Sequence, residues 1–206
     1  MTDTARIPLF PLGTALFPEG SLPLRIFEPR YRRMIAQCLK DHGSFGVCLI
    51  AAGREVGEPA VPYLLGTEAQ IVSADHLRNG VVDIVVRGRR RFRVLDHELE
   101  EDGLLTGTVR WLADPAPQPI PAHLVEVVPL LERLIEKYGG GHVIEPHRFD
   151  DAVWVGTRYA EWLPLKAEAK QRLLEMDDPL ERLEFVRDTL YELGMLPADP
   201  DAELRR

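Results

Sequence analysis

Apolar residues follow two different periods in the two halves of this 206-residue chain. Between residues 45 and 112, short apolar runs are separated by turn signals, which predicts an antiparallel β-meander. Beyond residue 121, apolar residues return every three or four positions, as in helices that pack through one face. The pattern therefore predicts the α+β class, with a β-rich head followed by a helical tail.

Five prolines interrupt the first apolar stretch, Ile7 to Arg33. Proline lacks a backbone N–H and restricts the residue before it, so this stretch predicts short extended pieces that turn and pack at once. A helix is expected to begin at Pro29 and to end at Gly43, since apolar residues between them recur at helical spacing. These residues are Tyr31, Met34, Ile35, Cys38 and Leu39.

The meander contains five predicted strands, which cover residues 45–51, 64–74, 81–86, 89–95 and 104–112. Asn79-Gly80 and Asp102-Gly103 are hairpin turn signals, because both dipeptides favour the positive φ that tight turns need. Four prolines within 114–121 then predict a stiff connector. The expected organisation is therefore a head over 1–113, a hinge over 114–121 and three or four helices within 122–206.

Composition narrows the classes of function. The formal net charge is -8 and the isoelectric point about 5.3, which argues against a general nucleic-acid-binding surface. Cys38 and Cys48 cannot form a disulfide framework and sit among apolar residues, so both are expected to be buried free thiols. A secretory signal and a membrane-spanning run are both missing, so a cytoplasmic protein that does not bind membranes is expected.

Catalytic and metal-binding motifs are sparse. His142 and His147 are the two histidines closest in sequence, with Glu145 between them, but Pro146 prevents the regular helix that an HExxH zinc site requires. The sequence contains no P-loop, no G-x-G-x-x-G and no G-x-S-x-G. We therefore predict no metal, no cofactor and no enzymatic activity.

A run of arginines lies in the predicted meander. Arg87, Arg89, Arg91 and Arg93 would share one face of a regular strand. They define an alternative function, the binding of RNA or a phosphate ligand. The opposing interpretation is a solvent-facing strand whose arginines pair with the acidic residues of 98–102.

Four segments together resemble the substrate-binding N-terminal domain of Lon proteases. They are IPLFPLGTALFPEGSLPLRIFEPRYRRMI (7–35), LLGTEAQI (64–71), NGVVDIVVRGRRRFRVL (79–95) and LPLKAEAKQRLLEMDDPLERLEFV (163–186). They occur in the family's order and span nearly the whole chain. One departure is Glu19-Gly20, since the family usually places glycine directly after the proline.

The resemblance implies a PUA-like twisted sheet or pseudo-barrel packed with a helical bundle. It also implies recognition of protein or unfolded peptide segments, with an ATP-dependent protease as a candidate partner. Full Lon proteases continue into an ATPase module and a Ser-Lys protease domain, whose motifs this sequence lacks. A stand-alone substrate-binding domain is therefore expected.

Peptide recognition would use an open sheet edge or an exposed apolar groove near the first helix. The candidate residues are Phe17, Pro18, Phe27, Arg30 and Tyr31. Core packing or helix capping is the alternative role for all five. An unrecognised small-molecule enzyme is a further alternative, and it would require a deep pocket with converging polar groups.

Overall fold

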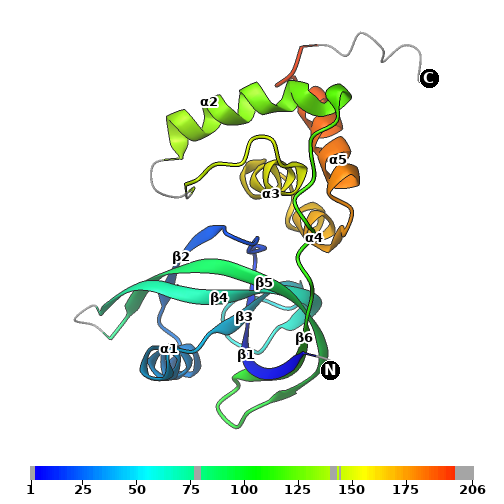
Figure 1. Cartoon of the computed structure of the whole chain (residues 1–206). Coiled ribbons are helices and arrows are strands. Elements are labelled where there is room, and N and C mark those ends of the chain that lie inside the picture. The colour runs from blue at the N-terminus through cyan, green and yellow to red at the C-terminus, as the bar shows by residue number, and fades with distance from the viewer. Residues whose placement is uncertain (1–2, 77–79, 140–142, 144, 198–206) are drawn as a thin grey trace. The chain divides into compact units, whose positions relative to one another are not determined.

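The computed structural model describes residues 3–76, 80–139, 143 and 145–197 (Figure 1). Its contacts divide the chain into two compact units. Unit 1 comprises Met1–Asp114 and Leu165–Glu175, and unit 2 comprises Pro115–Pro164 and Met176–Arg206. The chain thus enters unit 2 at Pro115, returns to unit 1 for one short helix, and enters unit 2 again at Met176.

Unit 1 contains the predicted head and confirms the α+β class. Its elements in the described part of the chain are β1 (Thr4–Leu12), β2 (Ser21–Ile26), α1 (Pro29–Asp41), β3 (Phe45–Ala52), β4 (Val61–His76), β5 (Val82–Leu99), β6 (Leu105–Trp111) and α4 (Ala167–Glu175). The two strands predicted over 81–86 and 89–95 are one continuous strand, β5. Asn79 of the predicted hairpin turn lies outside the described residues, whereas Gly80 has the positive φ of 78° expected there.

The strands of unit 1 bond in a ring. The order is β2-β5-β4-β3-β1-β6, and β6 pairs again with β5, so five strands close on themselves while β2 lies outside the ring. Four neighbouring pairs of this ring are antiparallel and one, β1 with β3, is parallel. The sheet is therefore mixed, where turn signals alone predicted an antiparallel one, because the crossover through α1 brings β3 back beside β1 in the same direction.

The prolines of β1 do not interrupt the ring. Thr4 to Pro8 pair with β6 only, Phe10 to Leu12 pair with β3 only, and Leu9 between them pairs with both strands. Pro8 and Pro11 therefore each need one hydrogen-bonding partner instead of two, which is the situation in which a strand tolerates proline. The first part of the stretch for which the sequence predicts short extended pieces is consequently the end of one nine-residue strand.

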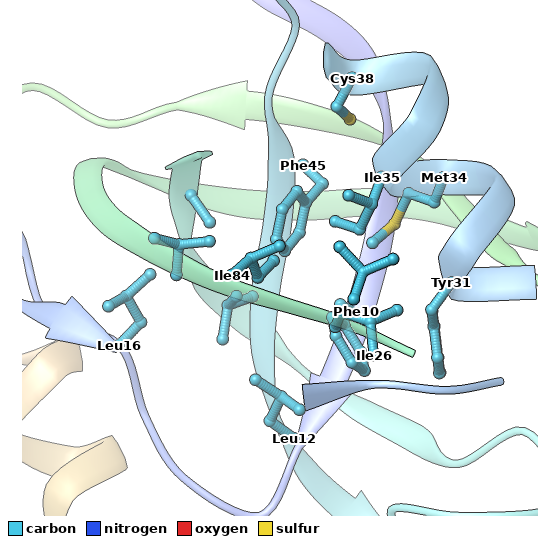
Figure 2. Close-up of a cluster of buried hydrophobic side chains, with 14 of the residues drawn as sticks. Phe10, Leu12, Leu16, Ile26, Tyr31, Met34, Ile35, Cys38, Phe45 and Ile84 are labelled. Atoms are coloured by element: carbon cyan, nitrogen blue, oxygen red, sulfur yellow. The ribbon is translucent and has the colours of Figure 1, made fainter. Parts of the chain in front are cut away.

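Strand β5 serves two apolar cores. Val82, Ile84 and Val86 pack in a core that α1 covers, together with Phe10, Met34 and Phe45 (Figure 2). Phe92 and Val94 pack in a second core with Leu9 and Cys48. Ala69 pairs with Gly88 and Thr67 pairs with Arg91, so β5 has one extra residue between them. This β-bulge reverses the alternation of side chains and switches β5 from one core to the other.

Glycines make room for the second core. A Cβ atom on Gly66 would overlap the carbonyl oxygen of Val47 and lie 2.9 Å from the Phe92 ring. A Cβ atom on Gly46 would lie 2.8 Å from Leu9. The Phe92 ring, which is completely buried, thus occupies space that side chains at these positions would otherwise fill.

Unit 2 contains η1 (Ala122–Val127), α2 (Val128–Tyr138), α3 (Ala152–Trp162) and α5 (Pro179–Glu192). Pro129 lies in the first turn of α2, directly after the 3-10 helix η1. Asp178 caps α5, since its side chain accepts a hydrogen bond from Leu180 N at 2.8 Å. Each of the described helices is too short or too polar to cross a membrane.

The crowding at Gly66 gives a direct test of the ring. Gly66→Ala should lower the free energy of unfolding by about 1–3 kcal/mol, because the added methyl group must displace backbone at Val47. Gly13→Ala is the matched control, since its nearest neighbour is a side-chain oxygen of Glu55 at 3.4 Å. Denaturant unfolding of both variants measures the difference, and equal stabilities would contradict the packing described here.

Candidate functional site

A tight turn delivers the chain into β2. Gly20 N donates to Phe17 O at 3.0 Å, which closes the turn, and Glu19 N donates to Gly88 O at 2.9 Å. Gly88 N in return donates to Gly20 O at 2.9 Å. A Cβ atom on Gly88 would overlap Phe17 O, so only glycine permits this approach. The turn is thereby pinned to β5 directly before the bulge.

Strand β2 is an open edge of the sheet. Among the described strands it pairs with β5 alone, from Ser21 opposite Arg87 to Ile26 opposite Val82. Gly20 bonds to β5, and backbone groups alternate in direction along a strand, so the backbone of Ser21, Pro23 and Arg25 points away from β5. Pro23 fits this position, because its missing N–H is not needed by the β5 ladder.

The five predicted peptide-binding residues separate into surface and interior. Phe27, directly after β2, exposes 49% of its surface, and Pro18, before β2, is half-buried. Phe17 is only 2% exposed and belongs to the interior. The ring of Tyr31 stacks on Phe10 with 3.9 Å between centroids, and this burial raises the pKa of Tyr31. The two ends of β2 therefore carry the accessible members of the set.

Arg30 holds loops of unit 1 together. Its guanidinium donates to Glu28 at 2.8 Å, to Gly57 O at 2.9 Å and to Gly103 O at 3.2 Å. The side chain is 7% exposed. Hydrogen bonds from a buried guanidinium to carbonyl groups of two separate loops indicate a structural role in this fold.

A shallow hollow of about 300 Å³ lies on one face of β2, β5 and β4. Two cross-strand rows line it: Ser73, Val85 and Pro23 form the first, and Asp75, Asp83 and Arg25 form the second. Arg25 donates to both carboxylate oxygens of Asp83, at 2.9 and 3.1 Å, which holds the pKa of Asp83 below its ordinary value.

Sequence reasoning did not single out the residues of this hollow. They come from three strands, and their pairing register becomes known only with the fold. Pro23 inside an apolar strand was the one available signal, because proline marks an edge strand. The hollow is open and shallow, unlike the deep pocket that a small-molecule enzyme would require.

The arginine run does not form one solvent-facing row. The bulge lies between Gly88 and Arg91, so Arg91 and Arg93 face the opposite side of the sheet from Arg87. Arg91 is 3% exposed and donates to Leu174 O of α4 at 2.8 Å. The prediction that four arginines share a face is therefore wrong. The acidic residues near 100 pair instead with Arg33, at 2.5 Å to Glu100 and 2.8 Å to Asp102.

The two cysteines and the metal-binding side chains are the remaining candidates for chemistry. Cys38 and Cys48 are buried free thiols, as predicted, and burial raises the pKa of the Cys48 thiol to about 12. A thiol with that pKa is not a nucleophile at neutral pH. His142 lies outside the described residues, and the rest of the described chain holds no group of three metal-binding side chains.

Comparison with known sequences identifies one family. The family described as the ATP-dependent protease La (LON) substrate-binding domain matches residues 6–192. The Lon protease of Parabacteroides distasonis is 28% identical over 207 residues, which cover 93% of this chain and 25% of that protein. The Lon protease of Solibacter usitatus is 26% identical, with 96% of this chain covered. The chain spans about a quarter of the length of these curated relatives.

Solved structures of Lon N-terminal domains have the same fold as this chain. A Lon N-terminal domain protein from Xanthomonas campestris is 35% identical and superposes with a TM-score of 0.74, covering 94% of this chain and 99% of that chain. The N-terminal domain of the Mycobacterium avium complex Lon protease has a TM-score of 0.64 at 18% identity, covering 89% of this chain and 97% of that one. The latter likeness concerns the fold alone.

The turn before β2 contains a testable strain. Glu19 has φ = 63°, in the left-handed region that favours glycine. Glu19→Gly should raise the free energy of unfolding by about 0.5–1 kcal/mol, since relief of this strain exceeds the entropy cost of glycine. Glu19→Ala is the control, because it removes the carboxylate without freeing φ, and it should give no gain. Equal gains in both variants, measured by denaturant unfolding, would assign the effect to charge.

Proposed function

The chain belongs to the Lon protease substrate-binding domain family, and we propose that it binds extended segments of unfolded proteins along the open edge of β2. The carrying observation is that edge, which pairs with β5 alone among the described strands. An extended peptide adds to such an edge through main-chain hydrogen bonds, which recognise no particular sequence. That property suits a domain that must accept many different substrates.

The backbone of β2 supplies the hydrogen bonds. Arg25 offers an outward N–H, and Pro23 offers an outward carbonyl group. Pro23 has no N–H, so one hydrogen-bond donor is missing from the outward edge of β2. This gap also limits pairing between copies of this chain. The edge is thus able to bind a strand while being a poor template for continuous aggregation.

Side chains at both ends of β2 supply apolar contact. Phe27 projects its ring at the C-terminal end, and Pro18 lies before the N-terminal end. The hollow beside Pro23 and Val85 receives side chains that alternate along an added strand. Apolar segments are exposed in unfolded proteins and buried in folded ones, so these contacts favour unfolded partners.

We further propose that the domain catalyses no reaction itself. The sequence motifs that it shares with its family are fold motifs and not catalytic ones. The thiols of Cys38 and Cys48 are buried and therefore unreactive. An ATP-dependent protease is the class of partner that would act on what it binds, whether joined to it or separate. This part of the proposal rests on the family of its relatives.

Two substitutions at one position isolate the main-chain contact. Arg25→Pro removes the outward N–H, whereas Arg25→Ala keeps it, and both lose the ion pair with Asp83. Arg25→Pro should weaken binding of a fluorescent, permanently unfolded protein about fivefold to tenfold relative to Arg25→Ala, because a main-chain hydrogen bond is lost. Fluorescence anisotropy without ATP measures both affinities.

Equal affinities of the two variants would contradict strand addition at β2. Circular dichroism and thermal unfolding must show that both variants are folded, as expected for proline at a strand edge. Phe27→Ala should also weaken binding. Its matched control is Leu99→Ala, a side chain of similar exposure on β5 outside the β2 pairing, which should bind like the wild type.

A further inference from the structure

Two exposed arginines stand directly opposite each other on the head. Arg93 of β5 pairs in register with Arg110 of β6, and Arg110 pairs in register with Thr4 of β1. Residues opposite each other across strands share a face, and their Cβ atoms lie about 4.5–5.5 Å apart. Thr4, Arg110 and Arg93 therefore form one row across three strands, and all three are exposed.

This juxtaposition is unfavourable without a ligand, because like charges directly opposite each other in a sheet destabilise it. Some of the other exposed arginines of unit 1 have carboxylate partners, for example Arg6 with Glu98 and Arg25 with Asp83. The side chains of Arg93 and Arg110 make neither an ion pair nor a hydrogen bond within the described residues.

We propose that Arg93 and Arg110 form a binding site for paired carboxylates on the helical surface of a protein partner. Each guanidinium presents a planar fork that binds one carboxylate through two hydrogen bonds. Acidic residues one helical turn apart have Cβ atoms about 5–6 Å apart, which matches the spacing of the two arginines. Residues two apart on a strand are separated by about 6.6 Å, a poorer match.

The surroundings favour a protein over a nucleic acid. The chain has a net charge of -8, which repels a polyanion. Single-stranded RNA also needs aromatic faces on which bases stack. The nearest candidate on these strands, Trp111, is covered by the guanidinium of Arg90 at 4.2 Å from its ring, and Phe92 is buried.

The site is separate from the β2 edge. Arg93 lies on the part of β5 after the bulge, which pairs with β6, and Arg110 lies on β6, whereas β2 pairs with the part of β5 before the bulge. A partner with an acidic helix could therefore dock on the head while the edge remains open. The inference does not depend on strand addition at β2.

Helical peptides test the site directly. The probe is a labelled alanine-rich helix with two glutamates at positions i and i+4, titrated by fluorescence anisotropy at low ionic strength. Arg93→Gln and Arg110→Gln should each weaken its binding about tenfold, because each removes one charge-assisted fork. Arg89→Gln is the matched control, since it changes the net charge equally at another exposed arginine of β5, and it should change affinity less than about twofold.

Further variants test the roles of the carboxylates, of the guanidinium fork and of the repulsion between the two arginines. Replacing both glutamates of the probe by glutamine should abolish binding, and Arg110→Lys should weaken it, because lysine keeps the charge without the fork. The melting temperature of the double Gln variant should equal or exceed that of the wild type, since repulsion is relieved. No binding of the acidic helix to the wild type, equal losses in Arg89→Gln, or preferential binding of single-stranded RNA would overturn the proposal.

Discussion

One extra residue in β5 determines how the head is built. Because of the bulge between Gly88 and Arg91, a single strand contributes Val86 to the core that α1 covers and Phe92 to the second core. The bulge also divides the partners of β5, which pairs with β2 before the bulge and with β6 after it. Because β6 closes the ring only on the second part, β2 is left with an open edge. The position of the proposed peptide site thus follows from a local irregularity.

Much of the fold was predictable from the sequence, and the reasons are local. Helix α1 begins at Pro29, as predicted, since capping chemistry depends on residues close in sequence. The left-handed residue that ends α1 is His42, one position before the predicted Gly43. The parallel pairing of β1 with β3 was not predictable from turn signals, because it depends on a crossover. Periodicity also could not reveal the bulge, so Arg91 was assigned to a surface from which α4 excludes it.

The candidate site was only partly predictable for a related reason. Phe17, Pro18, Phe27, Arg30 and Tyr31 all lie in the first segment that carries the family resemblance, residues 7–35. Such a segment mixes residues that build the turn and core with residues that remain accessible. Phe17, Arg30 and Tyr31 are of the first kind, as their burial and contacts indicate, whereas Phe27 is of the second. The hollow depends on the pairing of β2 with β5, whose partners lie some sixty positions apart in the chain, and no local pattern encodes that pairing.

Strand addition at β2 is the central claim, and amide hydrogen exchange measured by NMR tests it most directly. The Arg25 amide points to the open edge, whereas the Leu24 amide points to β5 and is an internal reference. On saturation with an unfolded polypeptide, exchange at Arg25 should slow by about tenfold or more, while exchange at Leu24 changes much less. Unchanged exchange at Arg25, with protection appearing on another surface, would contradict the account.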